Sequence, residues 1–229
     1  MIEDPPLMTI RKNFTRPTAD QVNNFQGVPC GFVVDAMQGR GALDYRIKPI
    51  SNDHAVFAGV AVTCDNGPAD NLAAFCAIEV AAPGDVILAA ADGFTETAVS
   101  GDLMLGIARN KGVAAFVTDG LVRDIEGIIE VGMPCFAMGV TPNSPVRNGP
   151  GTVGTPIVIG GCAAQSGDIV VGDINGVVVV PHAMIDHVID QLETIKVAEI
   201  EMDTKVKAGL TTPPFIEDFI NSKQLKEID

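Results

Sequence analysis

Three charged side chains within residues 101–124, GDLMLGIARNKGVAAFVTDGLVRD, have the types and the spacing to bind a metal cation together with a small acid. Asp102 opens an apolar, helix-like run, and the adjacent pair Arg123-Asp124 closes the stretch after a buried-looking strand. One helix followed by one strand can return the chain to the same edge of a sheet. Divalent cations such as Mg²⁺ prefer oxygen ligands, and a guanidinium binds carboxylates through paired hydrogen bonds. These residues therefore predict a site for a divalent cation and an anionic oxo acid.

The pair Arg123-Asp124 also has purely structural explanations. Asp124 can cap the helix that follows it, or it can form an ion pair with Arg123. In favour of a site, the pair follows residues 117–120, where a buried strand ends and a turn begins. Ligands commonly bind at that place in α/β sheets. Spacing alone leaves both interpretations open.

The elements that must position these residues alternate along the chain. Strands are expected over 55–63, 86–90, 113–118, 134–138, 157–159, 169–171 and 176–180, and helices over 19–25, 32–37, 71–81, 101–111, 125–131 and 181–208. Asp70 is expected to cap the helix over 71–81, and 141–155 is expected to be a loop. Because no linker divides the chain, we predict one α/β domain over 17–210 with a three-layer β/β/α arrangement. Residues 1–16 form an N-terminal arm and 211–229 a C-terminal tail.

Composition narrows the function classes. Apolar residues make up 47% of the 229 residues and charged residues only 19%, which favours a homo-oligomer that buries the surplus apolar surface. The net charge of −14 argues against nucleic acid as a partner, because that binding needs Lys and Arg to neutralise phosphates. No apolar run of about 18 residues is present, so no membrane span is expected.

The cysteines and histidines indicate neither a zinc site nor a disulfide framework. The five cysteines are odd in number, scattered, and free of any CxxC pattern, which fits reduced thiols and a cytoplasmic location. His182 and His187 lie five residues apart, not the three or four of a helical metal motif. The GxGxxG match over 149–154 is rejected as a nucleotide loop, because it contains Pro150 and precedes a strand.

The spacing Asp102, twenty residues, Arg123-Asp124, together with GDIVVGDINGVVVVP over 167–181, resembles the class II pyruvate aldolases related to the RraA regulator of RNase E. The similarity covers roughly residues 18–210. It implies the β/β/α swivelling-domain (RraA-like) fold, a homotrimer or homohexamer, and bound Mg²⁺ or Mn²⁺. It also implies retro-aldol cleavage of 4-hydroxy-4-methyl-2-oxoglutarate or 4-carboxy-4-hydroxy-2-oxoadipate to release pyruvate, with oxaloacetate decarboxylation as a second activity.

The resemblance also implies roles for individual residues. Asp124 would hold the metal, partly through waters, and Asp102 would bind one of those waters. Arg123 would bind the carboxylate or enolate end of the pyruvyl group. The backbone N–H groups of Leu103 and Met104, which follow Gly101 at a helix start, would receive the carboxylate.

An acid from the C-terminal helix of a neighbouring subunit also reaches the site in these aldolases. Glu199 is the candidate here and Glu201 the second choice, although both can equally belong to a solvated helix face. The general base would be a metal-bound water poised by Asp102 or Glu199. The tail over 211–229 would pack on a neighbouring subunit.

One position departs from the aldolase pattern. The aldolases usually carry an acid three residues after the motif's Asp, and this sequence has Gly127 there, with Glu126 one residue earlier. On a helix that shift turns the side chain by about 100°, so Glu126 either compensates or the metal surroundings differ. The alternative function is that of a non-catalytic RraA-type regulator that binds an RNA-degrading enzyme. A methyltransferase is poorly supported, because no convincing nucleoside-binding loop is present.

Overall fold

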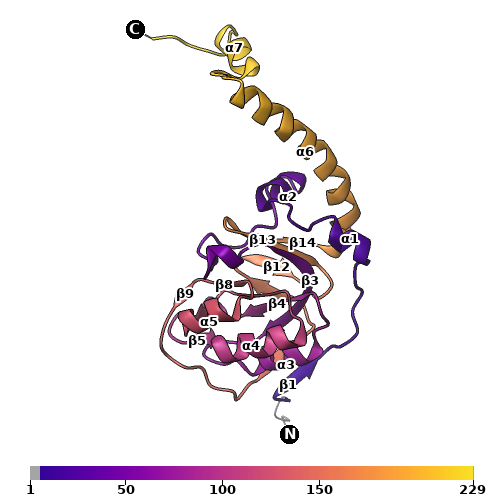
Figure 1. The fold of residues 1–229 in the computed structure, drawn as a ribbon, viewed down its shortest axis with the longest axis vertical. Helices are drawn as coiled ribbons and strands as arrows, with labels where there is room; N and C mark the ends of the chain where they lie inside the picture. The colour runs from indigo at the N-terminus through magenta and orange to yellow at the C-terminus, as the bar shows by residue number, and fades with distance from the viewer. Residues whose placement is uncertain (1–5, 229) are drawn as a thin grey trace.

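The structure, a computed structural model, describes residues 6–228 and arranges them as a layered α/β body with a long helical arm (Figure 1). The central sheet has nine strands: β1 (Met8–Ile10), β2 (Lys48–Pro49), β3 (Phe57–Asp65), β4 (Asp85–Ala90), β6 (Ala115–Thr118), β8 (Cys135–Ala137), β10 (Gly151–Val153), β13 (Ile169–Asp173) and β14 (Gly176–Val180). Two smaller sheets contain β11 (Ile157–Ile159) with β12 (Cys162–Ala164), and β5 (Ala98–Ser100) with β7 (Leu121–Val122) and β9 (Gly139–Val140). This confirms the expected β/β/α class.

Most of the helices pack on two different parts of the body. They are α1 (Ala19–Asn23), α2 (Cys30–Ala36), α3 (Leu72–Val80), α4 (Asp102–Lys111), α5 (Ile125–Val131), α6 (Ile185–Lys207) and α7 (Pro214–Ile220). Helices α3, α4 and α5 cover one face of the parallel strands β3, β4, β6 and β8. The β11–β12 pair packs against the other face, together with the β13–β14 hairpin, which continues the central sheet beyond β3. Helices α1, α2 and the start of α6 pack on the β13–β14 hairpin.

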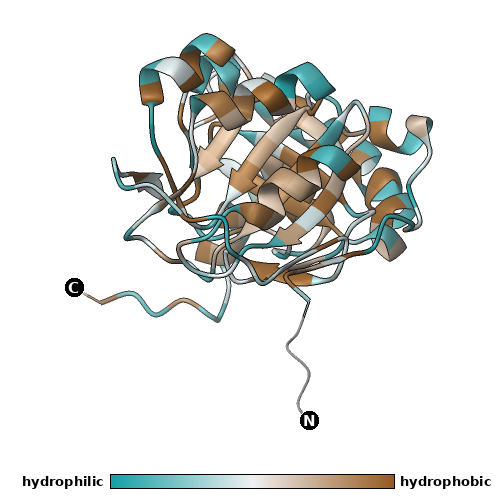
Figure 2. Ribbon diagram, turned by 90° about the horizontal axis from the view of Figure 1, so that it is seen from below, coloured by the Kyte–Doolittle hydropathy of each residue, from teal (hydrophilic) through white to brown (hydrophobic). Residues whose placement is uncertain are grey.

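Apolar side chains, most of them aliphatic, fill the spaces between the layers. Ile87 and Phe116 of the sheet meet Leu105 of α4 and Ile128 of α5, and all four are buried. Figure 2 shows the central strands as mostly apolar, while the covering helices alternate between apolar and polar surface. Because parallel strands are covered on both faces, they consist of nearly continuous apolar residues, as β4 does with DVILAA.

The structure differs from the expected elements at three places. Part of the N-terminal arm forms β1, which pairs in parallel with β10, and β10 lies within the expected loop over 141–155. Each is a three-residue strand whose hydrogen bonds come from distant segments, so local propensity carries no signal for it. The C-terminal helix begins at Ile185, because residues His182–Met184 form a 3-10 turn first. No helix within residues 6–228 has the length and apolar character of a membrane span.

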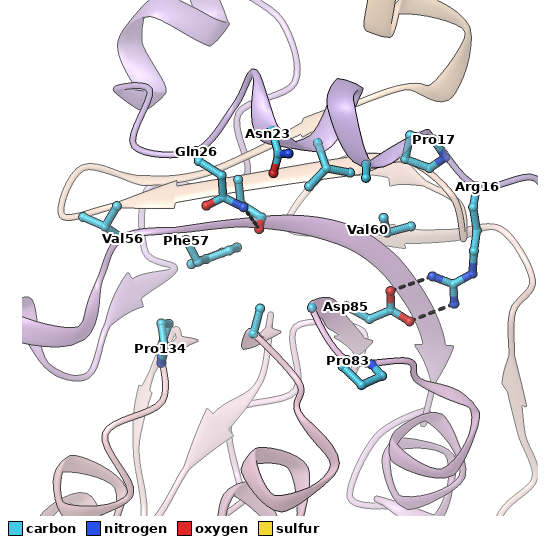
Figure 3. A pocket seen from close by; sticks show the side chains of 15 residues that line it. Arg16, Pro17, Asn23, Gln26, Val56, Phe57, Val60, Pro83, Asp85 and Pro134 are labelled. Carbon is cyan, nitrogen blue, oxygen red and sulfur yellow. Dashed lines mark hydrogen bonds and ion pairs between the residues drawn. The ribbon is translucent and has the colours of Figure 1, made fainter.

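The amino-terminal edge of the parallel strands holds a cavity of about 630 Å³ (Figure 3). The charged residues that line this cavity have a structural role. Arg16 donates two hydrogen bonds, of 2.6 and 2.8 Å, to the buried carboxylate of Asp85, which also accepts from the Ala82 N–H. This ion pair fastens the segment before α1 to the start of β4. Since the Asp85 carboxylate is fully engaged, no free charged group remains there for a ligand.

Helix α6 leaves the body after its first turns. Its buried residues are Ile185, Val188 and Leu192, all in its first half. The second half and α7 extend away from the body, with Val197, Ile200 and Phe215 more than half exposed. The chain therefore presents a helical arm with exposed apolar residues that its own body does not cover.

Candidate active site

A small parallel sheet brings the charged residues of the sequence motif together. Strand β5 runs directly into Gly101 and Asp102, β7 runs into Arg123 and Asp124, and β9 runs into the loop that carries Ser144. Strand β7 lies between β5 and β9, and all pairings are parallel. The Arg123 N–H donates to the Ser100 carbonyl at 3.0 Å, which fixes the register. Because the strands are parallel, their carboxyl ends meet at one edge, where ligands bind in such sheets.

A cavity of about 300 Å³ opens at this edge. Its wall includes Gly101, Asp102, Arg123 and Asp124 from the motif, together with Leu103, Met104, Asn71, Phe75, Ser144 and Arg147. It lies at the N-terminus of α4, where free backbone N–H groups and the helix dipole favour an anion. A small oxo acid fits this combination of guanidinium, helix start and carboxylates.

Asp124 has a backbone conformation that is unusual for a residue other than glycine. Its φ of 61° and ψ of 50° lie in the left-handed region, which costs roughly 1–3 kcal/mol when the structure imposes it. It occupies the N-cap position of α5, but its side chain makes no capping hydrogen bond. Instead Oδ2 lies 3.1 Å from Arg123 Nε, at the cavity. The capping explanation is therefore wrong, whereas the ion pair is present.

Arg123 and Gly101 complete the packing around that carboxylate. The Arg123 Nη1 group donates a short hydrogen bond to the Ser144 hydroxyl, so the guanidinium is held from two sides. A Cβ atom on Gly101 would lie 2.6 Å from Asp124 Oδ2 and 3.1 Å from Arg123 Cγ. Only glycine at position 101 leaves room for this arrangement.

The start of α4 differs in one respect from the expectation. The Leu103 N–H, one of the two amides expected to receive a carboxylate, donates to Asp102 Oδ1 at 2.7 Å. Met104 lies one residue further on, in the first turn, where the helix itself offers no acceptor. A substrate carboxylate would therefore use Met104 first, and it would use Leu103 only if Asp102 turns away.

Comparison with known proteins places the chain in a family. Residues 31–179 match the family described as RraA-like: Aldolase/RraA. The chain belongs to the RraA-like family. A relative from Halalkalibacterium halodurans, provisionally named a 4-hydroxy-4-methyl-2-oxoglutarate aldolase, is 37% identical over 173 residues, which are 75% of this chain and 81% of that one.

Solved structures agree with this RraA-like assignment. A protein of uncharacterised function from Pseudomonas syringae has a TM-score of 0.75 at 25% identity and covers 86% of this chain and 97% of its own. The RNA-processing inhibitor RraA from Thermus thermophilis has a TM-score of 0.62 at 27% identity and covers 67% of this chain and 93% of its own. Relatives of this chain are thus named both as an aldolase and as an RNA-processing inhibitor.

Gly127 is the position at which this RraA-like chain departs from the aldolase pattern, and it lies against Asp102. A Cβ atom there would lie 2.6 Å from both Cβ and Oδ2 of Asp102. Glu126 lines neither the 300 Å³ cavity nor the groove between α4 and α5, whereas Glu130 lines that groove beside Asp102. Glu130, and not Glu126, is the acid of α5 that shares a groove with Asp102.

We expect Gly127→Ala to destabilise the protein by about 1–3 kcal/mol, because the added methyl group forces α4 and α5 apart. Gly106→Ala is the matched control, since a Cβ there meets only Val131 Cγ2, at 4.0 Å, and should raise stability by up to about 1 kcal/mol. Urea unfolding of the two variants and the wild type measures both changes. Equal stability changes for the two variants would show that the contact with Asp102 is not tight.

Glu199 and Glu201 do not reach the cavity of their own chain. Both are exposed on the second half of α6, which extends away from the body (Figure 1). Neither lines the cavity at α4. Any contact with a site must therefore be made on another molecule.

Asn71 and Arg147 are among the residues of the cavity that have no counterpart in the sequence reasoning. Asn71, and not Asp70, is the N-cap residue of α3, although Asp70 Oδ1 accepts the Leu72 N–H at 2.8 Å. Arg147 lies in the loop after β9, within a stretch predicted only from its Gly and Pro content. A signal did exist in that loop, since Arg147 is its one basic residue, but nothing local shows which surface it faces.

The carboxylates present suit a hard cation that keeps part of its water shell. No group of three or more His, Cys, Asp or Glu side chains in the part of the chain described, 6–228, could hold a metal by itself. Asp102 and Asp124 nevertheless both line the cavity and offer carboxylate oxygens. Magnesium is commonly held by one or two carboxylates plus waters and substrate oxygens, so this donor set fits Mg²⁺ or Mn²⁺ better than zinc.

Proposed function

We propose that this RraA-like protein is a divalent-metal-dependent pyruvate aldolase that cleaves a 4-hydroxy-2-oxo diacid. The preferred substrates are 4-hydroxy-4-methyl-2-oxoglutarate and 4-carboxy-4-hydroxy-2-oxoadipate, with oxaloacetate decarboxylation as a second activity. The observation that carries the proposal is the cavity in which Asp102, Arg123 and Asp124 meet at the N-terminus of α4. The 37% identical relative with an aldolase name supports it.

The mechanism follows from where negative charge develops. Asp124 would hold the cation directly and Asp102 through water, and the bound cation would supply Lewis-acid chemistry at the carboxylate and keto oxygens of the oxo acid. The helix start at Met104 orients the substrate carboxylate. Arg123 lies beside Asp124 and stabilises the enolate charge that forms when the C3–C4 bond breaks.

The proton of the 4-hydroxyl group must leave as that bond breaks. The electron pair of the C3–C4 bond passes to the enolate of pyruvate, and C4 becomes the carbonyl carbon of the second product. A water positioned by Asp102, or by Glu199 of a neighbouring molecule, accepts the hydroxyl proton, and protonation of the enolate at C3 then gives pyruvate. Decarboxylation of oxaloacetate forms the same enolate without this base, so it is the less demanding reaction.

The helical arm formed by the second half of α6 and by α7 could bring an acid of one molecule to the cavity of another. Val197, Ile200 and Phe215 are exposed apolar residues of α6 and α7 that the body of the chain leaves uncovered. Packing of this arm on a neighbouring copy in a trimer or hexamer would bury that surface and carry Glu199 to the neighbour's cavity. The homo-oligomer belongs to the proposal for this reason.

A coupled pyruvate assay with oxaloacetate and the two aldol substrates tests the function. We expect pyruvate release from all three, loss of it in EDTA, and recovery when Mg²⁺ or Mn²⁺ is added in excess. Blanks without protein correct for spontaneous decarboxylation of oxaloacetate. Absence of pyruvate from every substrate with either metal would refute the proposal.

The second candidate is a regulator without chemistry, which the likeness to the Thermus RNA-processing inhibitor favours. The shared fold does not distinguish the two. A pull-down that captures RNase E, together with no pyruvate from any oxo acid, would reverse the order of the candidates. The carboxylate of Asp102 at the cavity favours the enzyme, because a docking surface has no need of it.

A further inference from the structure

The loop of residues 143–149 lines the cavity and is fastened to the start of α3. The Val146 N–H donates to the Ala69 carbonyl at 2.8 Å, and the Asn71 N–H donates to the Val146 carbonyl at 3.1 Å. Asp70 Oδ2 accepts from the N–H groups of Asn148, at 2.6 Å, and Gly149, at 3.0 Å. Four hydrogen bonds thus hold Arg147 and Asn71 beside one another.

Arg147 brings a positive charge to this side of the cavity. Its guanidinium carbon lies 5.0 Å from the centre of the Phe75 ring, which orients the group over α3. Among residues 6–228 it forms no ion pair, whereas Arg123 is paired with Asp124. A positioned guanidinium without a carboxylate partner is suited to bind an anionic group of a ligand.

Asn71 brings an acceptor that has no donor. Its side chain is 4% exposed, and its Nδ2 group donates to the Val99 carbonyl at 2.9 Å. That bond fixes the orientation of the amide, because the opposite orientation would bring two oxygen atoms together. The Oδ1 atom is then buried without a partner, although buried acceptors are almost always satisfied. The Asn71 side chain, which lines the cavity, therefore lacks one hydrogen-bond donor, such as a hydroxyl group.

We propose that Asn71 and Arg147 form the half of the site that recognises the far end of the substrate. Asn71 Oδ1 accepts from the 4-hydroxyl group, and Arg147 binds the carboxylate on the same carbon. This inference rests on the proposed function for the pyruvyl half of the site. It makes Arg147 the residue that selects 4-hydroxy-2-oxo acids with a second carboxylate over those with a methyl group in its place.

Binding of ligands that cannot be cleaved tests Arg147 without relying on catalysis. We would titrate the full-length protein with 2-oxoglutarate and with 2-oxopentanoate, which has a methyl group in place of the second carboxylate, in excess Mg²⁺ by calorimetry. The wild type should bind the diacid at least about 10-fold more tightly, as one charge-assisted hydrogen bond predicts. Arg147→Met should remove that preference, while Arg40→Met, which changes an exposed arginine outside the cavity, should keep it.

A wild type with no preference for the diacid, or an Arg147→Met variant that keeps it, would overturn the inference. Tighter binding of inorganic phosphate than of 2-oxoglutarate, lost in the same variant, would also overturn it, because Arg147 would then serve a free anion. None of these results depends on turnover. If the protein shows the expected preference for the diacid but releases no pyruvate, the proposed function is refuted and the role of Arg147 in binding the second carboxylate is not.

The hydroxyl contact is tested by a ratio of activities. Oxaloacetate has no 4-hydroxyl group, so Asn71→Ala should lower kcat/KM for aldol cleavage at least about 10-fold more than kcat/KM for decarboxylation. A purely structural role would lower both activities equally, and that result would contradict the role of Asn71. Residual decarboxylation also shows that the variant is folded.

Discussion

Asp124→Ala is expected to abolish pyruvate release from oxaloacetate and from both aldol substrates. The carboxylate lines the cavity beside Arg123 and is not used to cap α5, so the fold does not require it. Its removal would take away the direct ligand of the cation, and we expect kcat/KM to fall by about 10³-fold or more, on the order of 4 kcal/mol in the transition state. The coupled pyruvate assay in excess Mg²⁺ measures this loss.

Backbone strain supplies the control for that variant. Alanine is poorly accommodated at a φ of 61°. Asp124→Ala therefore removes the carboxylate and also replaces a residue that tolerates the left-handed backbone conformation. Asp124→Gly removes the same carboxylate and relaxes the backbone. Its unfolding free energy should therefore exceed that of Asp124→Ala by about 1 kcal/mol, while its activity is equally lost. Near-normal turnover in a clean preparation of either variant would refute the metal role of Asp124.

Arg123→Ala is expected to lower pyruvate release by about 10²–10³-fold, because the charge that stabilises the enolate is lost. Arg123→Lys should recover only part of this activity, since lysine is a point charge and lacks the guanidinium fork that contacts both Asp124 and Ser144. The affinity for Mn²⁺, followed by electron paramagnetic resonance, should change little, because arginine is not a metal ligand. The decisive measurement is therefore kcat/KM together with the Mn²⁺ dissociation constant.

A loss of Mn²⁺ affinity as large as the loss of kcat/KM would show that Arg123 acts only by holding Asp124. Arg40→Met is again the control, since Arg40 is exposed and lies outside the cavity. Full activity in Arg123→Ala would refute the role in enolate stabilisation.

The local elements around the site could be predicted because local patterns encode them. Residues 125–131 form α5 as expected, and α4 covers 102–111, one residue short of the prediction. Both helices have an apolar face of regular period and end at glycine. Strands β5, β7 and β9 were missed, because two or three residues carry no periodicity and their pairing joins segments about twenty residues apart.

By itself the sequence determined the residue types at the candidate site, the family, and the order of helix and strand that returns Arg123 and Asp124 to Asp102. Only the tertiary structure decided that β7 pairs with β5, that Gly127 lies against Asp102, and that Glu199 does not line its own chain's cavity. It alone also brought Asn71 and Arg147 together. The physical reason is that periodicity and spacing report the conformation of neighbouring residues. Contacts between distant segments depend instead on packing and on backbone hydrogen bonds that no local pattern specifies.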